Sequence, residues 1–146
     1  MQLNTSASVI SFAKQLEADS AAFYERIADR HPEAKEMVLT FSKQNSSYAT
    51  MIQRAYYGVI TDAIEGCFAF SVETDKYTFK GEPANEASFA DALTQAIDME
   101  QKLISFYTDA AEQSEALMAD VPRTFLIVAK KRKNREDKLR ALLRET

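Results

Sequence analysis

Four stretches of the chain repeat apolar residues every three or four positions, which is the spacing of one face of an α-helix. They cover residues 6–28, 33–56, 88–112 and 123–144. Helix-disrupting Gly and Pro are scarce, with three of each in 146 residues, and good helix formers are common. The pattern therefore predicts an all-α protein with four long helices in a single domain, residues 1–146.

Each predicted helix has one face that we expect to point into the core. The inward positions are Ile10, Ala13, Glu17, Ser20, Tyr24 and Ile27; then Val38, Phe41, Asn45, Tyr48 and Ile52; then Phe89, Leu93, Ala96, Glu100, Ile104 and Tyr107; and finally Phe125, Val128, Leu139 and Leu142. Ser6 or Ser8 is the expected N-cap of the first helix. Pro32 suits the first turn of the second helix, because proline lacks the amide hydrogen that this turn leaves unpaired.

The connection between the second and third helices, residues 57–87, is much longer than the other two. Phe68, Phe70 and Val72 alternate with polar or small residues, which favours an extended segment, and the sequence KGEP that follows is typical of a turn. A link of this length can return along the whole bundle, so that the helices it joins run parallel. We therefore expect a four-helix bundle with one long crossover between helices two and three.

Two of the inward faces contain the same unusual pair of residues. Glu17 precedes Tyr24 by seven positions, Glu100 precedes Tyr107 by seven, and each tyrosine follows a phenylalanine. Seven residues are about two helical turns, so each Glu shares a face with its Tyr. A carboxylate on a core face is costly unless a cation or hydrogen-bond donors meet it. The repeat therefore predicts two buried carboxylates that have partners.

The last helix carries cations at positions where apolar residues belong. Its inward spacing, continued between Val128 and Leu139, falls on Arg132 and Arg135 within the sequence KKRKNRE. These two arginines are about one turn apart on the same face. The inward face of this helix is therefore expected to be charged at its centre.

The helix-pair repeat, the Glu-x6-Tyr spacing and the long central link resemble the ferritin-like superfamily, specifically rubrerythrin-type proteins. This resemblance implies a ferritin-like four-helix bundle. In that family one Glu from each of helices one and three, with Glu-x-x-His from helices two and four, holds two irons. Glu17 and Glu100 match the two single Glu positions.

The other half of the iron site is missing from this sequence. The position of the Glu-x-x-His motif falls on residues 45–48, Asn-Ser-Ser-Tyr, in helix two, and on residues 132–135, Arg-Lys-Asn-Arg, in helix four. The only histidine, His31, precedes Pro32 in a turn. The Cys pairs that some rubrerythrins carry are also absent, since Cys67 is the only cysteine. The resemblance therefore implies a degenerate di-iron site.

We interpret the two arginines as fixed counter-ions that replace the metal. A guanidinium pairs with a carboxylate at two points and stays charged when it is buried. The bundle centre is then expected to hold a network of charges and hydrogen bonds with no bound cofactor. Its predicted members are Glu17, Glu100, Arg132, Arg135, Tyr24, Tyr48, Tyr107 and Asn45, with the tyrosines supplying hydrogen bonds.

The function expected from this interpretation is non-catalytic, as an interaction or structural protein that forms a homodimer. Two alternatives stay open. The first is an oxidoreductase that binds iron or manganese at an atypical oxygen site made by Glu17, Glu100 and Asn45. The second is the binding of an anion or nucleic acid by the basic last helix, for which no recognised nucleic-acid motif is present.

The charge of the chain is unevenly distributed. Residues 123–146 contain nine Lys or Arg and three acidic residues, a balance of +6, so the rest of a chain with net charge −4 carries −10. This basic helix can pair with the acidic remainder or stay solvated, and we expect one of these before nucleic-acid binding. No apolar run reaches 18 residues and no signal-peptide pattern begins the sequence, so a cytoplasmic protein without a membrane span is expected.

Overall fold

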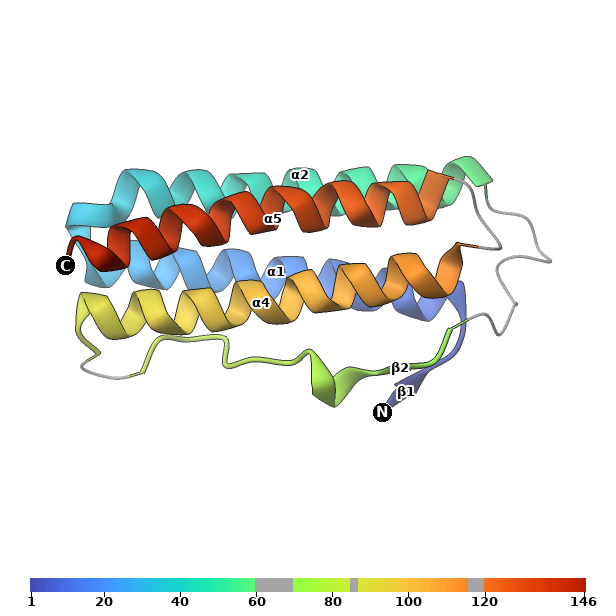
Figure 1. Cartoon of the computed structure of the whole chain (residues 1–146), viewed down its shortest axis with the longest axis horizontal. Coiled ribbons are helices and arrows are strands. Elements are labelled where there is room, and N and C mark those ends of the chain that lie inside the picture. Colours follow the sequence, from blue (N-terminus) through green and yellow to red (C-terminus); the bar gives the residue numbers. More distant parts are fainter. Residues whose placement is uncertain (60–69, 85–86, 116–119) are drawn as a thin grey trace.

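The structure is a computed structural model that describes residues 1–59, 70–84, 87–115 and 120–146. Its four long helices are α1 (Ser6–Arg30), α2 (Lys35–Val59), α4 (Phe89–Ser114) and α5 (Asp120–Arg144). They lie side by side along one axis (Figure 1). The predicted all-α class with four long helices is confirmed for the part of the chain that the structure describes. None of the helices in that part is long and apolar enough to cross a membrane.

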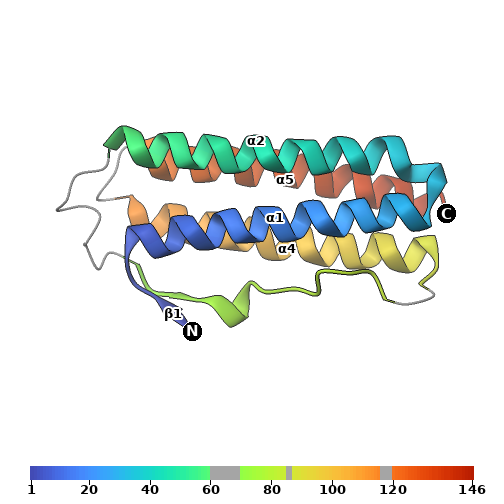
Figure 2. The same cartoon turned by 180° about the vertical axis from the view of Figure 1, so that it is seen from behind.

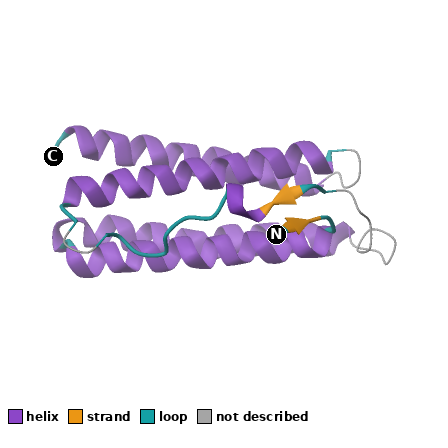
Figure 3. Cartoon of the chain, turned by 90° about the horizontal axis from the view of Figure 1, so that it is seen from below, coloured by secondary structure: helices purple, strands orange, loops and turns teal. Residues whose placement is uncertain are grey.

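The helices pack as two antiparallel pairs, α1 with α2 and α4 with α5 (Figures 1 and 2). Further contacts join α2 to α5 and α1 to α4, which closes the bundle around one core. In Figure 1, α2 and α4 both run from left to right. Residues 70–84 run back along the bundle beside α4, as Figure 3 shows from below.

The N-cap of α1 is Thr5, so the prediction of Ser6 or Ser8 is wrong by one to three residues. The backbone amide of Ser8 donates to the Thr5 hydroxyl oxygen at 3.2 Å. Ser6 is fully buried inside the first turn, and the Ser8 hydroxyl donates to the Thr5 carbonyl. The cap of α4 is Ser88, whose hydroxyl oxygen accepts a hydrogen bond from the amide of Asp91.

The second helix is shifted from its predicted range of 33–56. Residues Pro32–Ala34 form a short 3₁₀ helix, and the α-helix begins at Lys35. At its other end α2 continues to Val59, so the predicted connection of 57–87 begins three residues too early. The predicted positions Cys67 and Phe68 lie outside the described residues.

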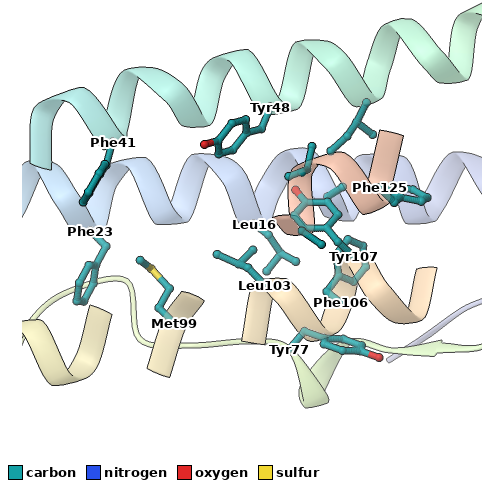
Figure 4. Packing of buried hydrophobic residues seen from close by; sticks show 14 of the residues in the cluster. Leu16, Phe23, Phe41, Tyr48, Tyr77, Met99, Leu103, Phe106, Tyr107 and Phe125 are labelled. Carbon is teal, nitrogen blue, oxygen red and sulfur yellow. The ribbon is translucent and has the colours of Figure 1, made fainter. Parts of the chain in front are cut away.

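The inward faces pack into one apolar core (Figure 4). Phe89, Ile104 and Leu142 were predicted to be buried, but each is only partly buried. In α4, Leu103 is fully buried next to the partly buried Ile104. The connecting segment also covers α4, because Tyr77 packs edge-on against Phe106 with ring centroids 5.4 Å apart. The buried stripe of α4 is therefore wider than the bundle alone requires.

The start of the chain pairs with the connecting segment, which the sequence pattern did not predict. Strands β1 (Gln2–Leu3) and β2 (Val72–Glu73) are antiparallel, with Leu3 opposite Val72. Phe70 and Val72 are buried and Ser71 is exposed, as their alternation predicts. A 3₁₀ turn, Thr74–Lys76, follows β2. This contact holds the connection against the bundle wall.

Candidate functional site

Arg132 lies at the centre of the bundle with none of its side chain exposed. It projects from α5 at an inward position, between Val128 and Leu139, both of which are fully buried. Its guanidinium forms ion pairs with one carboxylate from α1 and one from α4. The interruption of the apolar pattern in α5 is thus the place where a buried cation enters the core.

Arg132 binds Glu17 along one edge of its guanidinium. Nη2 donates to Oε1 at 2.7 Å and Nε donates to Oε2 at 3.2 Å, which is a two-point arrangement. On the other side, Nη1 donates to both oxygens of Glu100, at 2.7 and 2.6 Å. Glu17 is 2% exposed and Glu100 is fully buried. One arginine therefore connects the two acids that the sequence repeat singles out.

Two tyrosines complete the coordination of the carboxylates, each donating to the acid on the opposite helix. The Tyr24 hydroxyl of α1 donates to Oε1 of Glu100 at 2.6 Å. The Tyr107 hydroxyl of α4 donates to Oε2 of Glu17. The Glu-x6-Tyr repeat thus forms a reciprocal pair of bonds across the bundle, although Glu and Tyr also share a helix face.

Arg135 lies one turn beyond Arg132 and is 2% exposed. Its Nη1 donates to Oδ1 of Asn45 at 2.6 Å and to Oε1 of Glu100 at 3.3 Å. Asn45 Oδ1 also accepts from Arg132 Nη2 at 3.4 Å, so this amide oxygen links both arginines to α2. Each of the four long helices contributes at least one residue to the network.

Tyr48 contacts the network through its ring, which corrects the prediction that it supplies a hydrogen bond. The ring centroid lies 5.5 Å from the guanidinium carbon of Arg132 and 5.3 Å from that of Arg135. The rings of Tyr24 and Phe41 also lie near Arg135, with centroids at 5.3 and 4.7 Å. Aromatic faces at these distances attract cations and provide part of the solvation that burial removes.

The electrostatics of the site favour one protonation state. Burial raises the pKa of Tyr24 well above its ordinary value, and the nearby charge of Glu100 raises it further. Burial also raises the pKa of Tyr107 well above its ordinary value, and the nearby charge of Glu17 raises it further. Burial alone would lower the pKa of Arg132, but the charges of Glu100 and Glu17 outweigh it and raise this pKa. The tyrosines therefore stay neutral donors and the arginine stays charged.

The residues at this centre do not fit a di-iron site. The oxygens of Glu17 and Glu100 accept hydrogen bonds from a guanidinium that fills the space between them. The remaining polar groups around them are a second guanidinium, one amide and two phenols, with no imidazole. Among the described residues, no group of three or more His, Cys, Asp or Glu side chains is placed to hold a metal ion. A divalent cation here would also meet two fixed positive charges.

Sequence reasoning missed two acceptors of Arg135. Its Nη2 donates to the backbone carbonyl of Phe41 at 3.1 Å and to Oε1 of Gln44 at 3.2 Å. The carbonyl leaves no sequence signal, because every residue has one. Gln44 precedes the inward position Asn45 and its side chain is exposed, so its role depends on how closely α5 lies against α2.

The outer face of α5 carries the remaining positive charge. Lys130, Lys131 and Lys133 are exposed. Lys133 lies 3.4 Å from Asp137 and 3.6 Å from Glu136, so part of this charge pairs within the helix. Glu136 is itself buried and accepts from Arg140 at 2.7 Å. The basic run therefore divides into two buried arginines and a solvated outer face.

Comparisons with known proteins do not add an identity to this geometry. No family model, curated protein or solved structure matches the chain.

Proposed function

We propose that this chain is a ferritin-like bundle, with a crossover between α2 and α4, whose di-iron centre is replaced by fixed arginine charges. In this proposal the protein acts without catalysis, as a structural or interaction protein that associates with itself as a dimer. The repeated Glu and Tyr positions of α1 and α4, and the common direction of α2 and α4, support this assignment (Figure 1).

The observation that carries the proposal is the position of Arg132 between Glu17 and Glu100. Two carboxylates at the centre of a bundle require about two positive charges. Arg132 and Arg135 supply them within 3.3 Å, so the four groups are neutral together. A metal ion would have to displace a fully buried guanidinium from both acids.

The same geometry argues against acid–base catalysis at this centre. An arginine does not lose its proton at physiological pH, and both acids already accept several hydrogen bonds. The network is also buried, with each of its four charged side chains at most 2% exposed. Its role in this proposal is to hold the four helices in one arrangement and to present their outer faces to a partner.

Metal retention tests the proposal directly. Purified protein is incubated without oxygen with a small excess of Fe²⁺ or Mn²⁺, passed through a desalting column and analysed for metal. Oxygen consumption after Fe²⁺ addition is measured in parallel. We expect no retained metal and no oxidation above the protein-free rate, because the acids are occupied by Arg132.

A Glu17→Gln variant is the matched control, since it removes one candidate ligand at nearly constant side-chain volume. Retention of close to one metal ion per chain by the wild type, lost in Glu17→Gln, would overturn the proposal in favour of an atypical metal site.

Sedimentation across a range of concentrations tests the dimer separately, and a monomer at every concentration would contradict it.

A further inference from the structure

Arg135 has one hydrogen-bonding edge that is only partly used, because its Nε lacks an acceptor. A guanidinium presents Nε and Nη2 as two parallel donors, which match the two oxygens of a carboxylate. Arg132 uses this edge for Glu17. In Arg135, Nη2 donates to Gln44 and to a backbone carbonyl, whereas Nε has no partner among the described residues.

The unpaired donor, Nε of Arg135, is buried. The Arg135 side chain is 2% exposed, so water does not satisfy Nε freely. Buried polar atoms are nearly always hydrogen-bonded, and donors on charged groups are the most costly to leave unpaired. The edge therefore lacks one acceptor, at the position where Arg132 has a carboxylate oxygen.

A surface groove leads to the residues that cover this edge. Its volume is about 460 Å³, within the range of small-molecule sites, and it lies where α2 faces α5. Phe41 and Gln44 line the groove, and both also accept hydrogen bonds from Nη2 of Arg135. Gln44 is exposed, so its side chain can turn away without unfolding the helix. Arg135 itself does not line the groove, so Phe41 and Gln44 connect its guanidinium to the groove.

The chemistry of the groove changes along its length. Met37 and Phe41 provide an apolar floor, and Lys138 of α5 adds a positive charge. Glu33 and Glu36 lie at the end away from Gln44. At 1.5 Å per helical residue, about 12 Å separates the levels of Glu36 and Gln44 on α2. A ligand that matches the groove therefore has an anionic end, an apolar body and a far end that can lie beside Glu33 and Glu36.

We propose that this groove binds a small carboxylate with an apolar body, and that its carboxylate occupies the Nε and Nη2 edge of Arg135 after Gln44 turns aside. Lys138 offsets the added negative charge, because the network beneath is already neutral. The acids at the far end favour a ligand with a cationic terminus over one with an uncharged terminus. This site does not depend on the proposed function.

Titration calorimetry with three linear probes of similar length tests the site: 8-aminooctanoate, octanoate and octylamine. We expect 8-aminooctanoate to bind most tightly, octanoate more weakly, and octylamine roughly tenfold or more weaker than 8-aminooctanoate, since it lacks the group that Arg135 recognises. Equal binding of octylamine and 8-aminooctanoate, or no binding of either acid, would overturn the proposal.

Two substitutions at Gln44 give the sharper test, because both leave Arg135 in place. Gln44→Glu supplies an internal carboxylate to the Nε and Nη2 edge of Arg135, so it should abolish binding of the acids and raise the melting temperature. Gln44→Ala removes the side chain that covers the edge, so it should keep or strengthen binding. Ser47→Ala, at an exposed position on α2 outside the groove, is the matched control and should bind as the wild type does. Unchanged binding in Gln44→Glu would show that the acids bind elsewhere.

Discussion

The guanidinium Nη1 of Arg132 donates to both carboxylate oxygens of Glu100, at 2.7 and 2.6 Å, and neither side chain is exposed. A pair of this kind loses its hydration on both sides, so it need not add net stability. Removing only one partner is costly, because the other charge is then buried alone.

A double-mutant cycle on Arg135 and Glu100 should show strong coupling. We expect Arg135→Ala to lower the free energy of unfolding by about 3–5 kcal/mol, because it leaves a buried carboxylate undercompensated. Adding Glu100→Gln should recover much of this loss, so that the double variant is at least ~1 kcal/mol more stable than additivity predicts. Urea unfolding of the four proteins measures the coupling.

The exposed pair Lys133 and Asp137, 3.4 Å apart on the same helix, is the control for this cycle. Its coupling should not exceed ~0.5 kcal/mol, as is usual for solvated pairs. Simple additivity of Arg135→Ala and Glu100→Gln would contradict the ion-pair network.

Guanidinium ion should rescue a variant that lacks the central cation. Arg132→Ala leaves a cavity lined by Glu17 and Glu100, with the shape and charge of a guanidinium group. Because a ligand that binds only the folded state stabilises it, millimolar guanidinium should raise the melting temperature of this variant. Equal concentrations of urea should not raise this melting temperature, since urea is uncharged. The same shift in the wild type would show that the effect is unspecific.

Stability should fall at alkaline pH because of the buried tyrosines. The pKa values of Tyr24 and Tyr107 are raised in the folded state, so above about pH 10 the unfolded chain loses these protons first. The unfolded state then binds fewer protons than the folded state, and each tyrosine lowers the free energy of unfolding by about 1.4 kcal/mol per pH unit. The raised pKa of Tyr77 adds to the same trend.

Urea unfolding between pH 8 and 11 checks this sign. Tyr24→Phe and Tyr107→Phe should each reduce the slope above pH 10, whereas Tyr57→Phe should not change it, because Tyr57 is 61% exposed. A slope that is unchanged in both buried variants would contradict the assignment of the effect to these two hydroxyls.

The connecting segment should detach when its contact with α4 is weakened. The Tyr77 hydroxyl donates to Oδ2 of Asp109 at 2.5 Å, and Lys76 lies 3.2 Å from the same oxygen. Tyr77→Phe removes a hydrogen bond to a charged group and should cost about 1–2 kcal/mol. Hydrogen exchange should increase in residues 70–84 and remain unchanged at the bundle centre. Lys76→Ala should have little effect, because that pair is exposed.

The sequence predicted the four helices and the buried acids more reliably than the ends of helices and the roles of individual hydroxyls. Periodicity is a property of each helix alone, so Glu17 and Glu100 were identifiable by their position on an apolar face. The cap at Thr5 was missed because several neighbouring hydroxyls can form the same local bond. The ring contact of Tyr48 leaves no signal in the sequence, because it depends on how α5, which carries both arginines, lies against α2.

The sequence by itself determined that two acids and two arginines occupy inward positions, because a helix turns by a constant angle per residue. Only the tertiary structure decided which acid meets which arginine. Arg132 bridges Glu17 and Glu100, while Arg135 is shared among Glu100, Asn45 and Gln44. The same holds for the unpaired Nε of Arg135, since hydrogen bonds depend on distances and directions between helices that no single helix specifies.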